Sequence, residues 1–349
     1  MTDNTGAAAF AGLTELASEK VGGKALSASD EFFAEKENLL KPGRGIFLPD
    51  KFTENGKWMD GWESRRKREQ GHDWCIIELG ISGTVKGLDI DTNHFLGNHP
   101  PYASVDGYLH KDSGILINFD EIKWTPILGK SPLAPGSQNL FPVHHPGQWT
   151  HLRLNIFPDG GVARLRVYGD VHKGRIKKEK DGTIDLAALV NGGKVISAND
   201  MFFGSKDNLI SPGRSMYMGD GWETRRKRIP GYDWTILKLG EPGSIKKIIV
   251  DTNHFKGNFP DSCMIEGVYI GEVKEGVYLS EIDDDKMTSP DIKWKEILPK
   301  TKLKGHFENV FEKEITGKDK YTHLRLNIYP DGGVSRLRVF GFPEKDNSK

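Results

Sequence analysis

The sequence predicts an all-β protein built from two tandem jelly-roll β-sandwich domains. Three observations indicate this fold: a long internal duplication, short runs in which apolar and polar residues alternate, and frequent Gly, Pro, Asp and Asn turns between those runs. Several short strands separated by turns are typical of sandwiches and jelly rolls. Helical periodicity is weak, with one candidate helix near residues 29–40.

Length and composition narrow the class of protein. The chain has 349 residues, of which 36% are hydrophobic, enough for about two domains with packed cores. Its 49 basic residues balance its 49 acidic ones, which argues against a nucleic-acid binder or a protein held on an anionic membrane. No apolar run approaches the roughly 20 residues of a membrane span. With no basic leader and only Cys75 and Cys263, we expect a cytoplasmic protein.

The duplication predicts the domain boundaries. Four blocks return in the same order, and the last one matches at 16 of 19 positions. The first copy has ten extra residues between 45 and 59, and the second has an acidic loop at 281–285. The repeated blocks are 22–44 with 192–214, 60–68 with 220–228, 91–95 with 251–255, and 151–169 with 323–341. We therefore expect a tail (1–12), a first repeat (13–170), a linker (171–182), a second repeat (183–342) and a tail (343–349).

Strand patterns recur through each repeat. Trp74, Ile76 and, after a break in the alternation, Leu79 fit a strand that ends at Gly80, and residues 84–91 fit another. Since Cys75 corresponds to a Thr in the second copy and Cys263 to an Ala in the first, neither cysteine is expected to be a nucleophile.

The last repeated block predicts a ladder of polar side chains. Two alternating strands, 151–157 and 164–168, flank a Pro-Asp-Gly-Gly sequence typical of a hairpin turn. If both strands bury their apolar side chains in one core, Arg153, Arg164 and Arg166 share the opposite face. His151 and Asn155 lie alongside them, and the second copy repeats the set as His323, Arg325, Asn327, Arg336 and Arg338.

Two interpretations of these arginines stay open. Like charges side by side on a sheet are unfavourable, so a negative group is expected nearby. It is either an Asp or Glu of a neighbouring loop, which makes the arginines structural, or an anionic ligand held by guanidinium groups.

The Trp-Glu-x-Arg-Arg-Lys-Arg run also has more than one interpretation. It is a solvated run of charges, a nucleic-acid patch that a neutral chain does not favour, or a loop that lines a ligand site. A Gly-Trp pair precedes it and Gly-x-Asp-Trp follows it in both copies, so the loop is anchored at two tryptophans. The candidates are Glu63, Arg65 and Arg66, with Glu223, Arg225 and Arg226 in the second copy.

The Asp-Thr-Asn-His-Phe-x-Gly-Asn block ends a strand and enters a turn. Imidazole is a side-chain type that can exchange a proton near neutral pH. One interpretation therefore gives an acid–base role to His94 or to Asp91. The alternative is an Asx turn in which Asp91 and Asn93 bond backbone amides. No third ligand stands at metal-binding spacing, so we predict no metal ligands and no cofactor, while a need for a divalent ion stays open. The further members are Asn98, Asp251, His254 and Asn258.

Three blocks carry a resemblance to a known family. Asp-Gly-Trp-Glu-[Ser/Thr]-Arg-Arg-Lys-Arg, Asp-Thr-Asn-His-Phe-x-Gly-Asn and His-Leu-Arg-Leu-Asn-Ile-[Phe/Tyr]-Pro-Asp-Gly-Gly-Val occur in this order in both copies. Together they closely resemble allantoicase (allantoate amidinohydrolase) over about residues 13–342. The Asp-Trp-x-Ile-x-x-Leu-Gly strand and the Arg-Leu-Arg-Val-[Tyr/Phe]-Gly ending also resemble galactose-binding, discoidin-like jelly rolls, which often only bind ligands.

The resemblance implies a hydrolase that converts allantoate to ureidoglycolate and urea in purine breakdown through allantoin. Our hypothesis assigns acid and base roles to Glu63, His94 and Asp91, or to Glu223, His254 and Asp251. The expected substrate-binding residues are Arg65, Arg66, Asn98, His151, Arg153 and Arg164, with Arg225, Arg226, Asn258, His323, Arg325 and Arg336 in the second copy. A non-catalytic module that binds a sugar or another small ligand is the alternative, and a structural scaffold is a third reading. It stays open which repeat carries the working site, whether the site lies between the repeats, and whether the chain forms a homo-oligomer.

Overall fold

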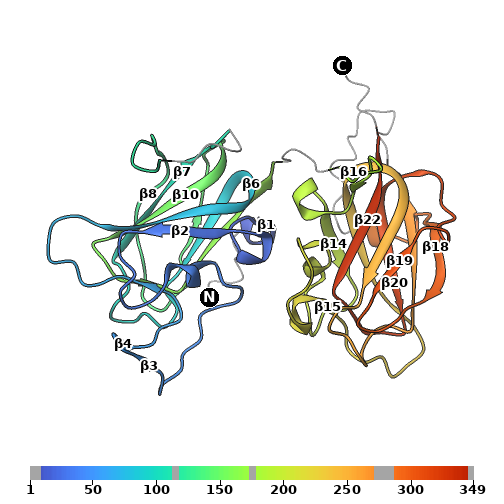
Figure 1. The fold of residues 1–349 in the computed structure, drawn as a ribbon, viewed down its shortest axis with the longest axis horizontal. Coiled ribbons are helices and arrows are strands. Elements are labelled where there is room, and N and C mark those ends of the chain that lie inside the picture. Colours follow the sequence, from blue (N-terminus) through green and yellow to red (C-terminus); the bar gives the residue numbers. More distant parts are fainter. Residues whose placement is uncertain (1–8, 112–117, 173–177, 271–286, 345–349) are drawn as a thin grey trace, which may run out of the picture. The chain divides into compact units, whose positions relative to one another are not determined.

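The computed structural model describes residues 9–111, 118–172, 178–270 and 287–344. The predicted tails and linker lie partly outside these residues, and the acidic loop at 281–285 lies wholly outside them. The chain divides into two compact units, Met1–His172 and Lys173–Lys349 (Figure 1). Each described unit is built from β-strands and short 3-10 helices, so the all-β prediction with two tandem jelly rolls is confirmed.

Most elements occur in the same order in both units. Unit 1 contains η1 (Ala9–Gly12), β1 (Thr14–Glu15), η2 (Glu19–Val21), β2 (Lys24–Ala28), η3 (Lys36–Leu40), β3 (Phe52–Thr53), β4 (Gly56–Lys57), β5 (Trp62–Glu63), β6 (Asp73–Asp91), β7 (Tyr102–Tyr108), β8 (Thr125–Pro132), β9 (Leu140–Pro142), β10 (Gln148–Phe157), β11 (Gly161–Val162) and β12 (Arg164–Val171). Unit 2 contains β13 (Ile184–Asp185), η4 (Leu189–Asn191), β14 (Lys194–Ala198), η5 (Lys206–Ile210), η6 (Met218–Asp220), β15 (Trp222–Glu223), β16 (Asp233–Asp251), β17 (Ser262–Val268), β18 (Lys295–Lys302), β19 (Glu308–Phe311), β20 (Lys320–Tyr329), β21 (Gly333–Val334) and β22 (Arg336–Pro343).

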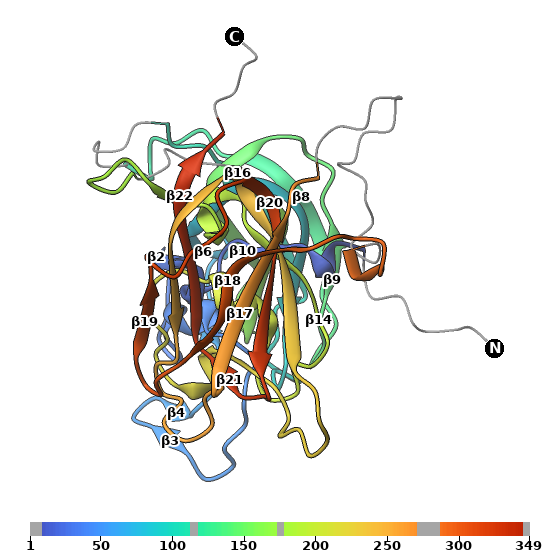
Figure 2. The same cartoon turned by 90° about the vertical axis from the view of Figure 1, so that its right-hand side faces the viewer.

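One long strand organises each sandwich. The first half of β6 pairs with β2 and β10, and its second half pairs with β12 and β9. In unit 2, β16 pairs in the same way with β14, β20, β22 and β19. Figure 2 shows β22, β16, β20 and β17 of that unit, which are neighbours in this order in the sheet. Leu237 and Val250, from opposite halves of β16, belong to one buried cluster, so the two halves enclose a common core.

Two predictions about the strands are wrong, one about where a strand ends and one about which strands pair. The runs ending at Gly80 and beginning at residue 84 form one continuous strand, β6, rather than two. Strands β10 and β12 do not form a hairpin, because β6 lies between them and pairs with each along a different half. The turn at residues 158–161 instead leads into β11, which pairs with β5. Alternation of side chains shows which residues a strand buries, but it does not identify the neighbouring strand.

The predicted arginine ladder is therefore absent. Arg153 lies opposite Ile76 and Asp106, whereas Arg164 lies opposite Asp91. The candidate helix near residues 29–40 is reduced to the single 3-10 helix η3.

A buried ion pair fixes the loop that precedes β5. Arg164 is only 3% exposed, and its Nη2 donates to Asp60 Oδ2 at 2.8 Å. The same carboxylate oxygen accepts the Ile46 backbone N–H at 2.9 Å. Burial acts to raise the pKa of Asp60, but the hydrogen bonds and the charge of Arg164 outweigh it and hold the pKa below its usual range. Arg336 and Asp220 repeat the pair in unit 2, at 2.8 Å.

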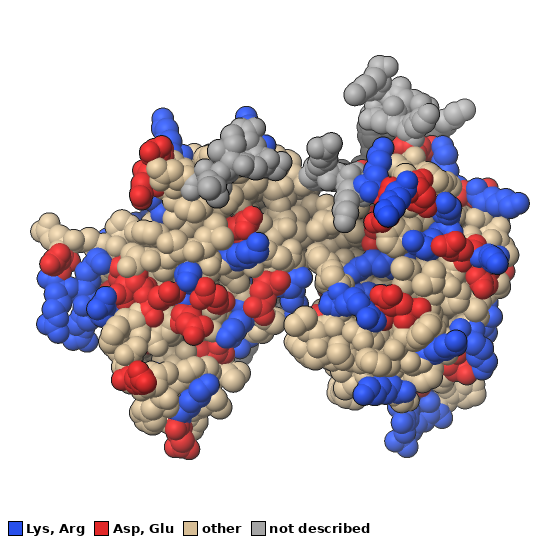
Figure 3. Space-filling model, viewed as in Figure 1, with Lys and Arg blue, Asp and Glu red and all other residues tan. Residues whose placement is uncertain are grey.

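Charged side chains of both signs are interspersed on the face of each unit that Figure 3 shows. None of the helices among residues 9–111, 118–172, 178–270 and 287–344 is long and apolar enough to cross a membrane.

We expect Arg164→Met to destabilise the protein by about 3–5 kcal/mol, because it leaves the Asp60 carboxylate buried without its partner. Chemical denaturation followed by tryptophan fluorescence measures the change. The exposed Arg68→Met, a control for loss of one positive charge, should shift the midpoint by less than about 0.5 kcal/mol. Equal stability of the two variants would show that the buried pair is not a structural anchor.

Candidate functional site

The Asp-Gly-Trp-Glu block forms one wall of a pocket in unit 1. Trp62 is fully buried, and its indole N–H donates to the Asp30 carbonyl oxygen at 2.8 Å. The next residue, Glu63, donates its backbone N–H to the Ala34 oxygen at 3.1 Å and accepts from the Phe33 N–H at 3.1 Å. On its other side β5 pairs with β11. The backbone of Glu63 is thus held on both edges, which fixes the direction of its side chain.

The Asp-Thr-Asn-His block forms the turn that leaves β6. Asp91 Oδ1 accepts the Asn93 backbone N–H at 2.9 Å, which is the Asx turn considered from the sequence. Arg44 binds both oxygens of the same carboxylate at 2.9 Å. His94 follows with a φ of 68°, in the left-handed region that few non-glycine residues adopt. Asp91 therefore holds the turn, while His94 is placed at its tip.

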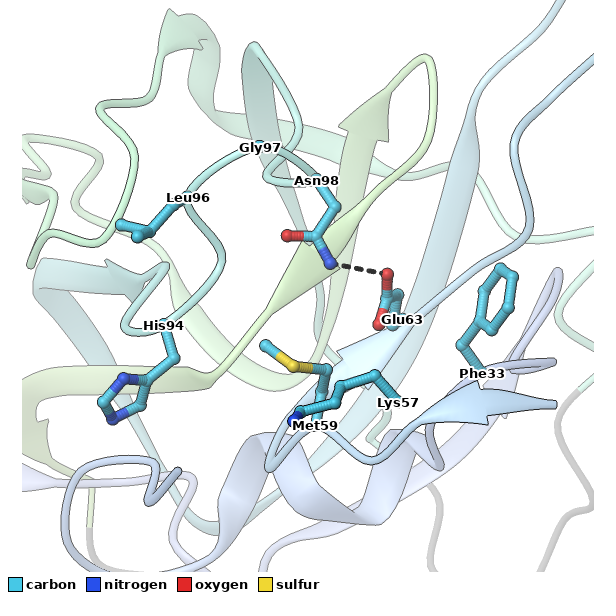
Figure 4. A pocket seen from close by; sticks show the side chains of 8 residues that line it. All are labelled: Phe33, Lys57, Met59, Glu63, His94, Leu96, Gly97 and Asn98. Atoms are coloured by element: carbon cyan, nitrogen blue, oxygen red, sulfur yellow. Dashed lines mark hydrogen bonds between the residues drawn. The ribbon is translucent and has the colours of Figure 1, made fainter. Parts of the chain in front are cut away.

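Glu63, His94 and Asn98 line a pocket of about 290 Å³, in which Asn98 faces Glu63 and the His94 ring lies farther from both (Figure 4). Asn98 Nδ2 donates to Glu63 Oε1 at 2.7 Å. Three residues from two separate sequence blocks, each predicted as a site residue, are therefore brought together by the fold. The remaining lining residues are Phe33, Lys57, Met59, Leu96 and Gly97.

The environment of Glu63 favours its protonated form. The residue is 9% exposed and lies beside Phe33 and Met59 in the pocket wall. Burial raises the pKa of the Glu63 carboxyl, while the hydrogen bond from Asn98 acts in the opposite direction and only partly offsets it. A carboxyl group with a raised pKa keeps its proton to a higher pH than an ordinary glutamate, which suits a proton donor.

His94 has one ring nitrogen engaged. Its Nε2 lies 3.1 Å from the Gly45 carbonyl oxygen, and because a carbonyl only accepts, this nitrogen carries the hydrogen of the pair. In the neutral imidazole the lone pair then resides on Nδ1. The ring stacks on Phe47 with a centroid distance of 5.5 Å and an interplanar angle of 27°. His94 is thus oriented with Nδ1 able to accept a proton or a hydrogen bond.

Four other predicted residues of the first copy lie elsewhere. Arg65 is exposed and donates from Nε to Asp30 at 2.7 Å, and Arg66 is exposed beside it. On β10, Arg153 donates to Asp106 at 2.9 Å, and burial lowers the pKa of His151. Arg164, a fifth, is paired with Asp60 as described above. None of these five is among the residues that line the pocket.

Unit 2 repeats the frame of this site. Asn258 Nδ2 donates to Glu223 Oε1 at 2.6 Å, and His254 Nε2 lies 3.0 Å from the Ser215 carbonyl oxygen. Arg214 binds Asp251 at 3.1 Å, as Arg44 binds Asp91. Here the His254 backbone N–H donates to His306 Nδ1, and Asn258 also contacts the Met218 sulfur.

The other predicted residues of unit 2 are engaged in local contacts. Arg225 pairs with Asp200 at 2.7 Å, and Arg226 is exposed beside it. Arg325 pairs with Glu266 at 2.7 Å, as its counterpart Arg153 pairs in unit 1. His323 lies buried on β20, with Thr322 Oγ1 2.9 Å from its Nδ1.

The aromatic and cationic side of the unit 1 pocket is not predicted by the repeated sequence blocks. Phe33, Lys57 and Met59 line it, Phe47 stacks on His94, and Arg44 fixes the turn. The one available signal was the ten-residue excess of the first copy between 45 and 59, since that segment contains three of these positions and adjoins Arg44.

The structure bears separately on the two cysteines and on metal binding. Cys75 and Cys263 are buried and free, and burial raises the pKa of both thiols, that of Cys263 to about 12. Within the part of the chain that the structure describes, no group of three or more His, Cys, Asp or Glu side chains is arranged to hold a metal ion.

Comparison with known proteins gives one consistent family. The model of the allantoicase repeat matches residues 14–172 and 184–344. The chain is 47% identical to a probable allantoicase of Photobacterium profundum, covering 95% of this chain and 97% of that relative. It is 45% identical to a probable allantoicase of Acinetobacter baylyi, covering 94% of each. The crystal structure of allantoicase from Saccharomyces cerevisiae is similar, with a TM-score of 0.80 and 35% identity over 98% of this chain and 99% of that one.

We expect the stability of Glu63→Gln relative to the native protein to increase as the pH rises. The folded-state pKa of Glu63 is raised, so its favourable contribution is full below the unfolded-state pKa and is lost as the pH rises through the folded-state value. Urea denaturation midpoints between pH 4 and 8 measure the difference. Glu69→Gln, at an exposed position, gives the effect of removing one negative charge alone. A difference that falls with rising pH would contradict the direction.

Proposed function

The chain belongs to the allantoicase family, and we propose that it cleaves its substrate in the unit 1 pocket between Glu63, His94 and Asn98. Its activity is hydrolysis of allantoate to ureidoglycolate and urea in purine catabolism. The observation that carries the assignment of the site is the meeting of Glu63, with its raised pKa, and the oriented imidazole of His94 at one pocket. The full-length family match favours this hydrolase over a non-catalytic binding module.

The reaction begins with a proton from Glu63. Allantoate carries one carboxylate and two ureido groups on a single carbon. The protonated Glu63 carboxyl donates to the nitrogen of the departing ureido group, and the C–N bond breaks with its electron pair on that nitrogen. The lone pair of the remaining ureido nitrogen stabilises the central carbon as urea leaves. Asn98 donates to Glu63 and so stabilises the carboxylate that this step creates.

The second step adds water. His94 Nδ1 takes a proton from the water as its oxygen bonds to the central carbon, which gives ureidoglycolate. The imidazolium then returns its proton through solvent, and Glu63 is protonated again for the next turnover. Each proton donated in one step is recovered in the other, so the net reaction consumes one water.

Unit 1 is proposed as the working copy for two reasons. Glu63 is buried, whereas its counterpart Glu223 is partly exposed. The segment that supplies Lys57 and Phe47 to the unit 1 site is ten residues shorter in unit 2. Unit 2 has the same main strands and turns but a shorter loop. It therefore keeps the fold without the loop residues that line the pocket of unit 1.

The proposal includes a cytoplasmic location. Both cysteines are buried and unpaired, which suits a reducing compartment.

Glu63→Gln is expected to lower kcat for urea release from allantoate by about 10²–10⁴-fold, because glutamine has no acidic proton to give. The matched variant Glu223→Gln should retain kcat within about threefold. A coupled assay for urea with purified full-length protein measures both, and circular dichroism confirms folding. Near-normal turnover of Glu63→Gln would overturn the glutamate assignment, and selective loss in Glu223→Gln would move the site to unit 2.

Urea release should persist after incubation with a chelator, since the proposal assigns both proton transfers to side chains. The measurement is the initial rate before and after chelation and dialysis. A rate that disappears and returns with a divalent ion would contradict this expectation and would make Asp91 and His94 candidate ligands.

A further inference from the structure

The extra residues of the first copy form a hairpin beside the pocket. Strands β3 and β4 pair through Phe52 with Lys57 and Thr53 with Gly56. This pairing brings Lys57 into the lining that contains Glu63. Figure 4 shows the Lys57 side chain extended alongside Met59, which also lines the pocket. The hairpin therefore adds a cationic group that the shorter loop of unit 2 does not supply at this place.

The ammonium of Lys57 is held without a carboxylate partner. It lies 5.0 Å from the ring centroid of Phe47 and 4.8 Å from that of Phe52, and it donates to the Pro49 carbonyl oxygen. Among the described residues it forms no ion pair. Aromatic faces and a carbonyl position an ammonium group but leave its charge uncompensated.

Four other cationic side chains of unit 1 are already paired. Each of these side chains contacts a carboxylate at 2.7–2.9 Å: Arg44 with Asp91, Arg65 with Asp30, Lys67 with Asp73, and Arg164 with Asp60. Recruiting one of them for a ligand would leave its carboxylate without a partner, which is costly when that carboxylate is buried. Lys57 binds an anion without that loss.

We propose that Lys57 is the residue that recognises the substrate carboxylate, an inference that rests on the function proposed above. An ion pair at Lys57 anchors one of the three polar groups on the central carbon. The two ureido groups are then directed toward Glu63 and His94, so Lys57 is a binding and specificity residue rather than a proton-transfer group. The hairpin thus makes unit 1 selective for an anionic ureide.

The test compares two ligands in a chain that does not turn over. In a Glu63→Gln background, calorimetry measures Kd for allantoate and for its neutral primary carboxamide. Adding Lys57→Met should raise Kd for allantoate about 10–100-fold, because a charge-assisted contact is lost. It should change Kd for the carboxamide by less than about threefold. Equal changes for both ligands, or no change for either, would overturn the inference.

Two further variants separate charge from folding. Lys57→Arg keeps the charge and should hold Kd for allantoate within about fivefold of the background. Lys51→Met removes a lysine from the same loop that stacks on Trp58 at 3.8 Å and does not line the pocket, so Kd should stay unchanged. Loss of affinity in Lys51→Met equal to that in Lys57→Met would attribute the effect to the loop as a whole and overturn the role of Lys57.

Steady-state kinetics in the otherwise native chain distinguish failure of this inference from failure of the proposed function. Lys57→Met should raise KM for allantoate by the same 10–100-fold with kcat within about threefold. Normal kinetics in Lys57→Met, together with turnover by the native chain, would overturn the Lys57 assignment alone. Absence of urea release from the native chain and from Lys51→Met would overturn the proposed function, and with it the premise of this inference.

Discussion

The central constraint of each unit is that one long strand finds hydrogen-bond partners on both edges in each of its halves. Strand β6 does so with β2 and β10 first, then with β12 and β9. It ends at Asp91. The turn that follows is held by Asp91 and Arg44, and it presents Asn98 to Glu63 of β5 and His94 to the same pocket. The site is thus a consequence of where the longest strand stops.

Many basic side chains form ion pairs with carboxylates of the same unit. Few of them therefore remain available to bind a ligand. Arg164 and Arg153 are structural partners of Asp60 and Asp106, which agrees with the structural interpretation of the repeated arginines. Glu63 differs, since it is buried with an amide partner instead of a cation. Burial without a counter-charge raises its pKa, and the same feature that disfavours its ionised form in the fold suits it to donate a proton.

The two repeats share the strands and turns that carry the pocket residues, but one loop differs between them. Glu223, His254 and Asn258 keep the contacts of their counterparts, so the strands and turns that carry the site are the same in both units. The difference lies in the segment before the Asp-Gly-Trp-Glu block, where unit 1 has the β3–β4 hairpin. Loops tolerate such insertions at small energetic cost, and they are where new contacts to a ligand are most easily added.

Residue patterns alone predict the class of fold, the duplication and most of the polar residues that line the pocket. These follow from local information: the period of alternation, turn residues, and repetition of Glu63, His94 and Asn98 in matched blocks. Which strands pair and which charged groups form ion pairs depends on contacts between distant residues, and these are seen only in the tertiary structure. Side-chain alternation is identical for a strand whether β6 or β12 lies beside it, so β10 and β12 were wrongly paired. Lys57 was missed for the same reason, because its place in the pocket depends on a hairpin folding back over residues that are distant in the chain.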